Sequence, residues 1–555
     1  MSEPDPRREV IDPTANAAES PAPAVPPRKL NAKAAGVVGA AVMCSRVLGL
    51  LRELIFAALF GAGKSMDAFV VAFRTPNLLR DLFAEGALSA AFVTTFSKKI
   101  ETEGDNSAWR LASKVATLAA VFMSLVVILG ILVAPWLIKF FAPGFDPEKA
   151  ALTVLLARIM YPFILLVSLA ALVMGMLNSK NVFGVPAMAS SFFNIGSIAG
   201  GVALGWWIDP TWGPRALIGL ALGTLIGGAL QLLVQVPSLR KVGFRFRPDF
   251  NWRDEGVRKI LQLMGPAVIA ASSVQVNVMI NTMFASTLQD GAVSWLQIAF
   301  RLMQLPLGMF GVAIATVTLP LISRSAAAGN PSEFGSILSR GMRLAFLLTV
   351  PSTLGLYLLA EPIISIIYER GRFTPQMTIE TAAALQFYAI GLVAYSGMKV
   401  LSPAFYAIDK RKTPMVVSFI AIALNVLFNW IFTFELGMGH RGLALSTGCV
   451  ALTNFTVLYV LMRRENPHLE TGLMFTTAVK LSLAGALLAV VCWAGQRWLL
   501  ADWAQLRFVL KAAYLGGIIA VAALVYFGTA MALRIGELDD VTALLKRKLG
   551  RFRRR

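Results

Sequence analysis

The sequence is poor in histidine and cysteine. Its 555 residues include two histidines, His440 and His468, which stand apart near the ends of predicted helices, and three cysteines. We expect the histidines to be loop or capping residues rather than members of a proton relay. The cysteines are odd in number and lack C-x-x-C spacing, which argues against a disulfide framework or a zinc site. Since no nucleophile–base constellation is present, the sequence predicts a protein that is not an enzyme.

Charged residues are also scarce. They make up 15% of the chain, against about 25% in soluble globular domains, while hydrophobic residues reach 57%. This composition excludes a soluble globular protein, and the apolar fraction excludes a disordered chain. Long uncharged runs are present instead. Val115–Val133 has the length that crosses a bilayer, roughly 20 residues, and Leu481–Trp493 is the centre of another such run. We predict an all-α polytopic membrane protein.

Apolar segments alternate with short turns from residue 34 onward. Residues 1–33 are rich in Pro and Ala and lack the apolar core of a signal peptide, which indicates a disordered tail. We expect about fourteen transmembrane helices, near residues 34–60, 66–96, 115–141, 152–178, 185–208, 214–238, 256–288, 292–322, 339–367, 378–408, 413–437, 441–462, 473–499 and 508–533.

The basic residues indicate how these helices are oriented. An even number of spans places both termini on one side, and most of the 51 Lys and Arg residues fall on that side, including the loop Arg240–Lys259 and the tail up to Arg555. Because positive loops stay cytoplasmic, we expect both termini in the cytoplasm. A basic face beside anionic membrane lipid accounts for the net charge of +20, so we expect no nucleic-acid partner.

A weak internal repeat relates segments about 227 residues apart. Asp67–Arg74 aligns with Ser294–Arg301, and both end in Ala-Phe-Arg. This alignment joins the second expected span to the eighth and predicts two parallel six-helix lobes. The resulting domains are a tail at 1–33, an N-lobe at 34–240, a C-lobe at 241–465, two further helices at 466–535 and a basic tail at 536–555.

Several charges fall deep inside the expected spans, where an ionised group costs a few kcal/mol unless it faces a cavity or a partner. Arg46 and Glu53 share one helix face, with Arg52 beside them. We interpret Arg46, Arg52 and Arg301 as anion ligands, since Glu53 is the one carboxylate near them and guanidinium suits phosphate or carboxylate. The alternative is a set of structural ion pairs between helices, which we favour for three other cations inside the spans, Arg74, Arg158 and Lys399.

Several motifs together resemble the MurJ (MviN) lipid II flippases. They are Ser45-Arg-Val-Leu-Gly-Leu-Leu-Arg-Glu53, Phe60–Gly63, Asp67-Ala-Phe69, Pro76–Arg80, Phe83–Ser89, Met264–Pro266, Gly371–Phe373 and Lys399–Pro403. The resemblance covers roughly residues 34–535. It implies fourteen helices, with two six-helix lobes packed in a V and two extra helices that border a groove for the lipid tail. It also implies transport of lipid II from the cytoplasmic to the outer leaflet of the bacterial inner membrane.

The resemblance also implies site residues. It places substrate-binding positions in the cavity at Ser45, Arg46, Arg52, Glu53, Asp67, Arg80, Glu85 and Arg301. Three positions depart from the family pattern. Glu53 stands where members often have aspartate, Asp81 stands where a second basic residue commonly follows Arg80, and Gln304 replaces a glutamate.

A sodium site described for part of the family would fall at Asn281, Asn425, Asn429 and Thr447. Aspartates are replaced at the first position and at the last asparagine, so at most a weak sodium site is expected. Asn425 and Asn429 could equally be hydrogen-bonding residues between helices.

No cofactor is implied, and no G-x-x-x-x-G-K-[ST] motif occurs. The driving force would then be a monovalent cation, the membrane potential or downstream consumption of the product. Two alternatives to lipid II transport stay open. One is export of another polyprenyl-diphosphate-linked glycan or a cationic drug, although the arginines argue against a cation. The other is a membrane scaffold that transports nothing.

Overall fold

The computed structural model describes residues 32–82, 88–501 and 503–538, and within them every regular element is a helix, which confirms the all-α prediction. Both expected tails therefore lie largely outside the described residues. The first half of the chain forms α1 (Ala32–Phe60), α2 (Lys64–Leu79), α3 (Ser89–Glu103), α4 (Asp105–Phe141), α5 (Pro147–Met160), α6 (Phe163–Ser179), α7 (Gly184–Ile208), α8 (Ala216–Leu233) and α9 (Val236–Lys241).

The second half continues with helices of similar length. These are α10 (Glu255–Ser286), α11 (Ala292–Pro306), the π-helix η2 (Leu307–Gly311), α12 (Val312–Ala327), α13 (Pro331–Leu358), α14 (Ala360–Tyr368), α15 (Pro375–Ile390), α16 (Leu392–Ala407), α17 (Lys412–Trp430), the π-helix η3 (Ile431–Glu435), α18 (His440–Glu465), α19 (Thr471–Trp498), the short 3₁₀-helix η4 (Trp503–Gln505) and α20 (Phe508–Ala532).

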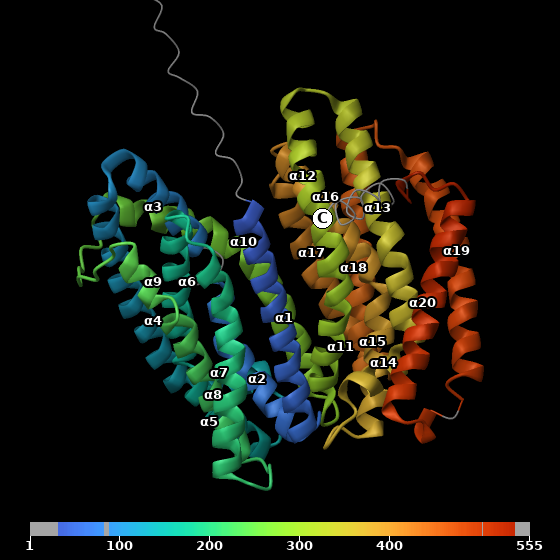
Figure 1. The fold of residues 1–555 in the computed structure, drawn as a ribbon, viewed down its shortest axis with the longest axis horizontal. Helices are drawn as coiled ribbons and strands as arrows, with labels where there is room; N and C mark the ends of the chain where they lie inside the picture. Colours follow the sequence, from blue (N-terminus) through green and yellow to red (C-terminus); the bar gives the residue numbers. More distant parts are fainter. Residues whose placement is uncertain (1–31, 83–87, 502, 539–555) are drawn as a thin grey trace, which may run out of the picture.

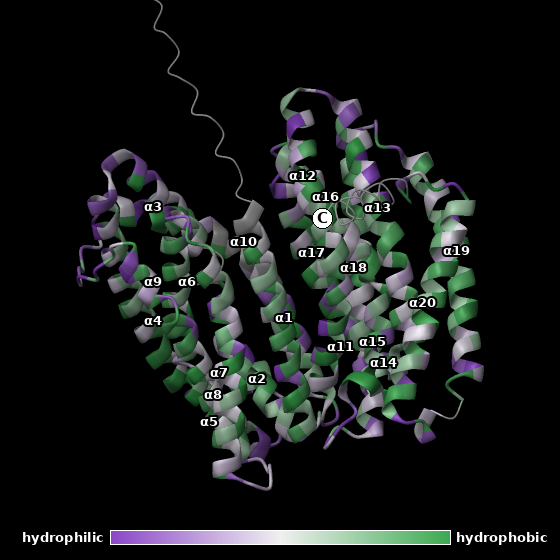
Figure 2. Ribbon diagram, viewed as in Figure 1, coloured by the Kyte–Doolittle hydropathy of each residue, from purple (hydrophilic) through white to green (hydrophobic). Residues whose placement is uncertain are grey.

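The surface of the helices is suited to a bilayer. Large apolar side chains such as Trp136 and Leu524 point outward, and polar residues gather at the two ends of the molecule (Figure 2). Within the described residues, ten helices are long and apolar enough to cross a membrane, or eleven if α15 and α16, bent by 43°, form one span. The multi-pass prediction is confirmed, but the expected number of fourteen spans is not.

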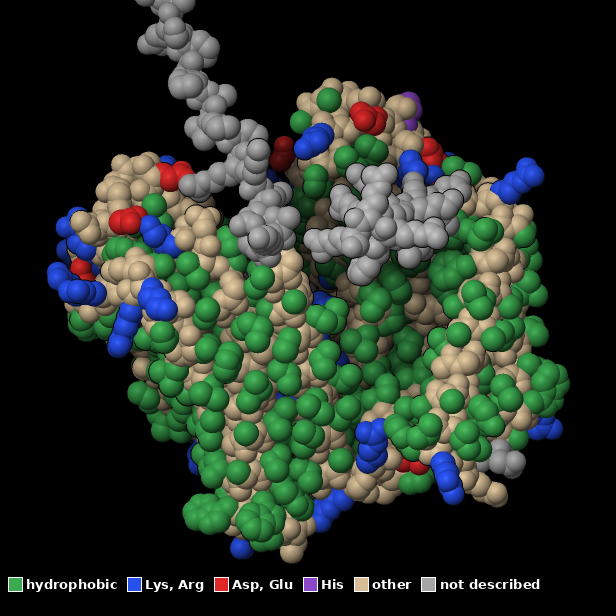
Figure 3. Space-filling view, viewed as in Figure 1, with side chains coloured by type: hydrophobic (Ala, Val, Ile, Leu, Met, Phe, Trp, Pro, Cys, Tyr) green, Lys and Arg blue, Asp and Glu red, His purple; other side chains and the backbone are tan. Residues whose placement is uncertain are grey.

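The helices form two lobes (Figure 1). Helices α1 to α9 make up one lobe and α11 to α18 the other, and the lobes separate toward the end where α1 begins. Helix α10 contacts both, since it packs on α3 and α4 as well as on α17 and α18, while α19 and α20 pack on each other and against α13 and α14. This arrangement confirms the two-lobed fold with extra helices, and Figure 3 shows the hollow between the lobes.

Small residues allow α7 and α8 to pack closely. A Cβ atom on Gly219 would lie 2.1 Å from the backbone nitrogen of Gly205, and one on Gly223 would lie 2.3 Å from that of Gly201. In lipid, where burial of apolar surface does not drive association between helices, such close backbone approach provides the van der Waals contact that does.

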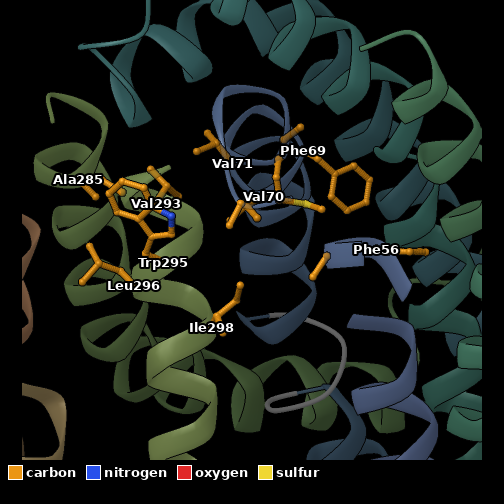
Figure 4. Packing of buried hydrophobic residues seen from close by; sticks show 14 of the residues in the cluster. Phe56, Phe69, Val70, Val71, Ala285, Val293, Trp295, Leu296 and Ile298 are labelled. Atoms are coloured by element: carbon orange, nitrogen blue, oxygen red, sulfur yellow. The ribbon is translucent and has the colours of Figure 1, made fainter. Parts of the chain in front are cut away.

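Apolar packing joins the lobes at the end opposite the hollow. Phe56, Phe69 and Val70 of the first lobe belong to the same buried cluster as Trp295 and Ile298 of the second, as Figure 4 shows. The lobes are therefore closed at one end and open at the other.

Candidate functional site

A cavity of about 80 Å³ lies between the lobes at the closed end of the hollow. It contains charged groups from both lobes. Its walls come from α1, α2, α7, α8 and α11, with lining residues Arg52, Glu53, Phe56, Ala57, Gly61, Met66, Phe69, Val70, Phe73, Ser197, Thr224, Ser294, Gln297, Ile298 and Arg301.

An ion pair crosses this cavity. The Arg301 guanidinium of α11 lies 2.7 Å from a carboxylate oxygen of Glu53 on α1. Glu53 is 16% exposed and Arg301 is 41% exposed. The second carboxylate oxygen of Glu53 is buried and has no hydrogen-bond partner among the described residues. The Tyr368 side chain of the second lobe also interacts with Glu53.

Arg52 provides a second guanidinium in the same cavity. It lies over the ring of Phe193, 5.0 Å from the ring centroid, and it interacts electrostatically with Arg301, Glu53 and Arg80. Cation–π contact holds the side chain in place without neutralising it. Arg52, Arg80 and Arg301, three of the arginines that the sequence analysis selected, therefore lie near one another.

Arg80 pairs with a carboxylate of its own lobe, whereas Arg301 pairs with Glu53 across the lobes. Its guanidinium donates to Asp81 Oδ1 at 2.9 Å from Nη2, and Asp81 also accepts from Gln275 of α10 at 3.3 Å. Asp81, which departs from the family pattern, is therefore one partner of Arg80. Glu85, which the resemblance also implied, lies outside the described residues.

Arg46 lies nearer the open end of the hollow. It is six residues before Arg52, roughly 9 Å along the helix axis, and its side chain is exposed. Its Nη1 lies 3.6 Å from where a Cβ atom on Gly308 of η2 would be, so the guanidinium extends from α1 to the second lobe. Ser45 beside it accepts a hydrogen bond at its carbonyl from Asn194 at 3.1 Å, which ties α1 to α7.

Asp67 lies at the closed end of the cavity and contacts the second lobe directly. Its carboxylate accepts hydrogen bonds from the backbone of Gly291 at 2.7 Å, from the backbone of Ser294 at 2.9 Å and from the Ser294 hydroxyl at 2.7 Å. Lys149 of α5 lies 3.0 Å from it and also pairs with Asp290 at 2.7 Å. A carboxylate at the start of α11 satisfies free backbone N–H groups and the helix dipole.

This cluster, here called the Asp67 latch and made of Asp67, Lys149, Gly291 and Ser294, lies away from the arginines. Ser294 precedes Arg301 by seven residues, roughly 10 Å along α11. Asp67 is 1% exposed and Lys149 is 4% exposed. Lys149 was not among the residues selected from the sequence, because the expected span begins at residue 152, whereas α5 begins at Pro147.

A second contact joins the lobes at the closed end. The backbone of Arg372, in the turn between α14 and α15, donates to Ala58 of α1 at 2.8 Å. The Arg372 guanidinium donates to the carbonyls of Thr211 and Trp212 in the first lobe. Gly371 has a φ of +59°, and a Cβ atom there would lie 2.3 Å from the Ala58 carbonyl oxygen. Gly371–Phe373 is one of the motifs that carry the family resemblance, but the sequence alone does not indicate this contact.

The four residues of the expected sodium site do lie together. Asn429 donates to Asn281 at 2.9 Å and to Asn425 at 3.1 Å, and Asn281 donates to Thr447 at 3.5 Å. In the part of the chain that the structure describes, no group of three or more His, Cys, Asp or Glu residues could hold a metal ion. The cluster consists of neutral amides and a hydroxyl that are linked by these bonds, while the Asn429 amide oxygen and the Asn425 amide nitrogen are buried without a hydrogen-bond partner among the described residues.

The remaining cations inside the spans, Arg74, Arg158 and Lys399, do not line the cavity. Arg74 donates to Gln297 at 2.9 Å and to Thr282, so it links α2 to α11 and α10. Arg158 donates to the Ile131 carbonyl at 3.1 Å. Lys399 is exposed, with no hydrogen bond or ion pair among the described residues.

Comparison with known proteins gives a consistent result. A family model described as lipid II flippase MurJ matches residues 56–514. A probable lipid II flippase MurJ of Rhizobium tropici is 36% identical over 523 residues, which is 93% of this chain and 96% of the relative. The lipid II flippase MurJ of Burkholderia cenocepacia is 34% identical over 495 residues, which is 88% of this chain and 94% of the relative.

Solved structures with the same fold were also found. A structure described as lipid II flippase MurJ in the inward closed conformation has a TM-score of 0.70 at 25% identity, over 89% of this chain and 99% of that chain. An inward-facing multidrug transporter of the MATE family has a TM-score of 0.66 over 79% of this chain and 99% of its own, at 16% identity. The second likeness concerns the fold alone.

Proposed function

The chain belongs to the family of the lipid II flippase MurJ, and from this premise we propose how its residues move lipid II. It is a transporter rather than an enzyme, and a multi-pass protein of the bacterial inner membrane. Its substrate is lipid II, a lipid-linked precursor of peptidoglycan. Neither of the two alternatives, a different cargo or a scaffold, is favoured.

We propose that Arg46, Arg52 and Arg301 clamp the diphosphate of lipid II in the hollow. The observation that carries this proposal is the charge balance of the cavity: two guanidinium groups, from Arg52 and Arg301, share one carboxylate, Glu53. Unneutralised positive charge is unfavourable in a dry cavity and favourable once an anion enters. Arg46, placed nearer the open end, would meet the diphosphate first.

Asp67 has a different role in this proposal. Its carboxylate already accepts three hydrogen bonds and an ion pair, which leaves it no capacity for a ligand. It holds the lobes together opposite the opening, and release of this latch accompanies the rocking of the lobes that opens the other side. Ser45 and Arg80 act as supports for α1 and for the end of α2.

The open end faces the cytoplasm in our proposal, because α1 begins there (Figure 1) and positive loops remain cytoplasmic. Both termini then lie in the cytoplasm, with the basic tail beside anionic lipid. The membrane potential supplies about 2.3 kcal/mol per elementary charge per 100 mV. We propose it as the driving force in preference to sodium, because the amide cluster around Asn429 lacks a carboxylate.

Complementation of a strain depleted of its own flippase tests the clamp. Arg46→Ala, Arg52→Ala and Arg301→Ala should each fail to support growth, and Arg→Lys should fail wherever the guanidinium binds two oxygens, because lysine keeps the charge but loses the fork. Arg158→Ala, an arginine bonded to one carbonyl, is the control and should grow. Purified protein in liposomes with labelled lipid II should show the same order of activity, and normal flipping by the alanine variants would refute the clamp.

A further inference from the structure

A second pocket lies outside the hollow, at the foot of the second lobe. It has a volume of about 320 Å³ and is lined by residues of α14, α20 and the turn after α14: Ser365, Ile366, Glu369, Arg370, Phe508 and Lys511. None of them lines the cavity between the lobes. Helix α20 starts here (Figure 1), so the pocket lies where a membrane span meets water, and basic side chains are visible at this edge in Figure 3.

Two cations are held in place at this pocket. The Arg370 guanidinium lies 4.9 Å from the centroid of the Phe508 ring, and the Lys511 ammonium lies 5.1 Å from that of Trp503. Aromatic faces orient a cation and do not cancel its charge. Across the described ranges, neither cation lies within ion-pair distance of a carboxylate. Glu369 also lines the pocket, and its carboxylate accepts a hydrogen bond from Thr378 at 2.7 Å.

A buried hydroxyl completes the set of donors. Ser365 is 6% exposed and its oxygen accepts a hydrogen bond from Trp503 Nε1 at 3.1 Å. No acceptor for the Ser365 hydrogen occurs among the described residues, so the hydroxyl can still donate into the pocket. A guanidinium, an ammonium and a hydroxyl thus surround one space, and their formal charge with Glu369 is +1.

We propose that this pocket binds the phosphate group of a lipid headgroup in the leaflet opposite the termini. Phosphate accepts charge-assisted hydrogen bonds from arginine and lysine. Tryptophan and neighbouring aromatic rings are typical of the interface, where headgroups lie. Two cations that lack a carboxylate partner among the described residues favour an anionic headgroup such as phosphatidylglycerol over a zwitterionic one, whose choline would be repelled; Arg370 also donates to the Ile366 carbonyl at 2.9 Å. This role goes beyond the transport of lipid II and does not depend on it.

The test uses the purified full-length chain in neutral detergent and measures lipid binding by native mass spectrometry. The probes are dioctanoyl phosphatidylglycerol, dioctanoyl phosphatidylcholine and inorganic phosphate. Phosphatidylglycerol should bind more tightly than phosphatidylcholine. The double variant Arg370→Gln with Lys511→Gln should weaken phosphatidylglycerol binding by at least about tenfold, the effect of losing one charge-assisted contact. Ser365→Ala, which removes a single hydroxyl, should weaken it by a smaller factor and guards against misfolding of the double variant.

Lys139→Gln is the matched control, because Lys139 is an exposed cation in the last turn of α4, at the same end of the molecule. It should bind the lipid as the wild type does. Equal affinity in the wild type and the double variant, or an equal loss in Lys139→Gln, would overturn the site. Inorganic phosphate that binds as tightly as phosphatidylglycerol would overturn the assignment to a lipid. A lipid II flipping assay on the same variants keeps this result separate from the clamp.

Discussion

Glu53 of α1 and Arg301 of α11 form an ion pair of 2.7 Å between the two lobes. The spacing of Arg46 and Glu53 predicted a shared helix face, but the partner of Glu53 comes from the other lobe. A ligand that takes the Arg301 guanidinium from Glu53 would therefore change the contact between the lobes. Binding in the cavity and movement of the lobes are coupled at this pair.

A double variant separates a ligand-binding arginine from a structural one. Arg301→Ala should abolish complementation, and Arg301→Ala with Glu53→Gln should still fail, because the diphosphate has lost a charge-assisted contact of about 1.5–3 kcal/mol. A purely structural pair predicts rescue, since removing both partners of a buried pair is milder than removing one. Growth of the double variant at wild-type rate, with membrane levels checked by immunoblot, would rule out Arg301 as a ligand.

The Asp67 latch predicts a graded loss of stability. Asp67→Asn places an amide beside the Lys149 ammonium and two backbone N–H groups, so it should cost about 3–5 kcal/mol, as expected for breaking a buried pair. Asp290→Asn removes a partner that is 54% exposed and should cost about 0–1 kcal/mol. The midpoint of thermal unfolding of the detergent-solubilised protein measures both. A smaller fall for Asp67→Asn than for Asp290→Asn would contradict the latch.

Much of the fold could be predicted from the pattern of apolar residues. The expected span 256–288 coincides with α10, Glu255–Ser286, and the span 185–208 with α7, Gly184–Ile208. Breaks within spans were not predicted, such as the one between α5 and α6 near Pro162. Hydropathy reports how much apolar sequence crosses the bilayer, whereas a break depends on local backbone geometry.

The sequence analysis selected Arg52, Glu53 and Arg301, which line one cavity in the structure, but it did not indicate how the selected residues pair. The repeat aligned Asp67 with Ser294 as equivalent positions, and the structure places these two residues in direct hydrogen-bonding contact. Equivalent positions in two related lobes can meet where the lobes face one another. The partners Lys149 and Glu53–Arg301 could not be predicted, because they depend on how each helix is rotated and how far apart the lobes stand.

The turn at Gly371 predicts a difference between two glycines. Gly371→Ala incurs the cost of a left-handed residue with a side chain, about 1–2 kcal/mol, and also forces its Cβ atom against the Ala58 carbonyl oxygen at 2.3 Å. Gly329→Ala, with a φ of +64° and nothing within 4 Å, incurs the first cost alone. Thermal unfolding should show the larger fall for Gly371→Ala. Equal falls would mean that the turn does not hold the lobes.

Asp254 predicts a pH dependence outside the membrane. It caps α10 and lies 2.7 Å from Lys114. Burial would raise the pKa of its carboxyl, but the hydrogen bond and the charge of Lys114 outweigh burial and lower it. Its stabilising effect is then complete above the ordinary pKa, about 3.9, and is lost as the pH falls through the lower folded-state value.

Asp254→Asn keeps the cap and removes the charge, so the variant should be less stable than the wild type near neutral pH, with a gap that closes below about pH 4. Unfolding midpoints across pH measure this gap, and Glu255→Gln, a change at an exposed neighbour, is the control. A gap that widens in acid would show the sign to be wrong.

The amide cluster predicts transport without sodium. Asn281, Asn425 and Asn429 bond one another, and neutral amide oxygens bind a hard cation more weakly than carboxylates do. Replacing sodium with potassium should therefore leave lipid II flipping in liposomes unchanged. Asn429→Ala should lower the unfolding midpoint equally in both salts, because it removes hydrogen bonds between helices rather than an ion ligand.

Asn429→Asp is the informative counterpart: it adds the missing carboxylate beside Asn281 and Asn425 and should make the unfolding midpoint rise with sodium. Sodium-dependent flipping in the wild type that Asn429→Ala abolishes would show that the amides alone form an ion site.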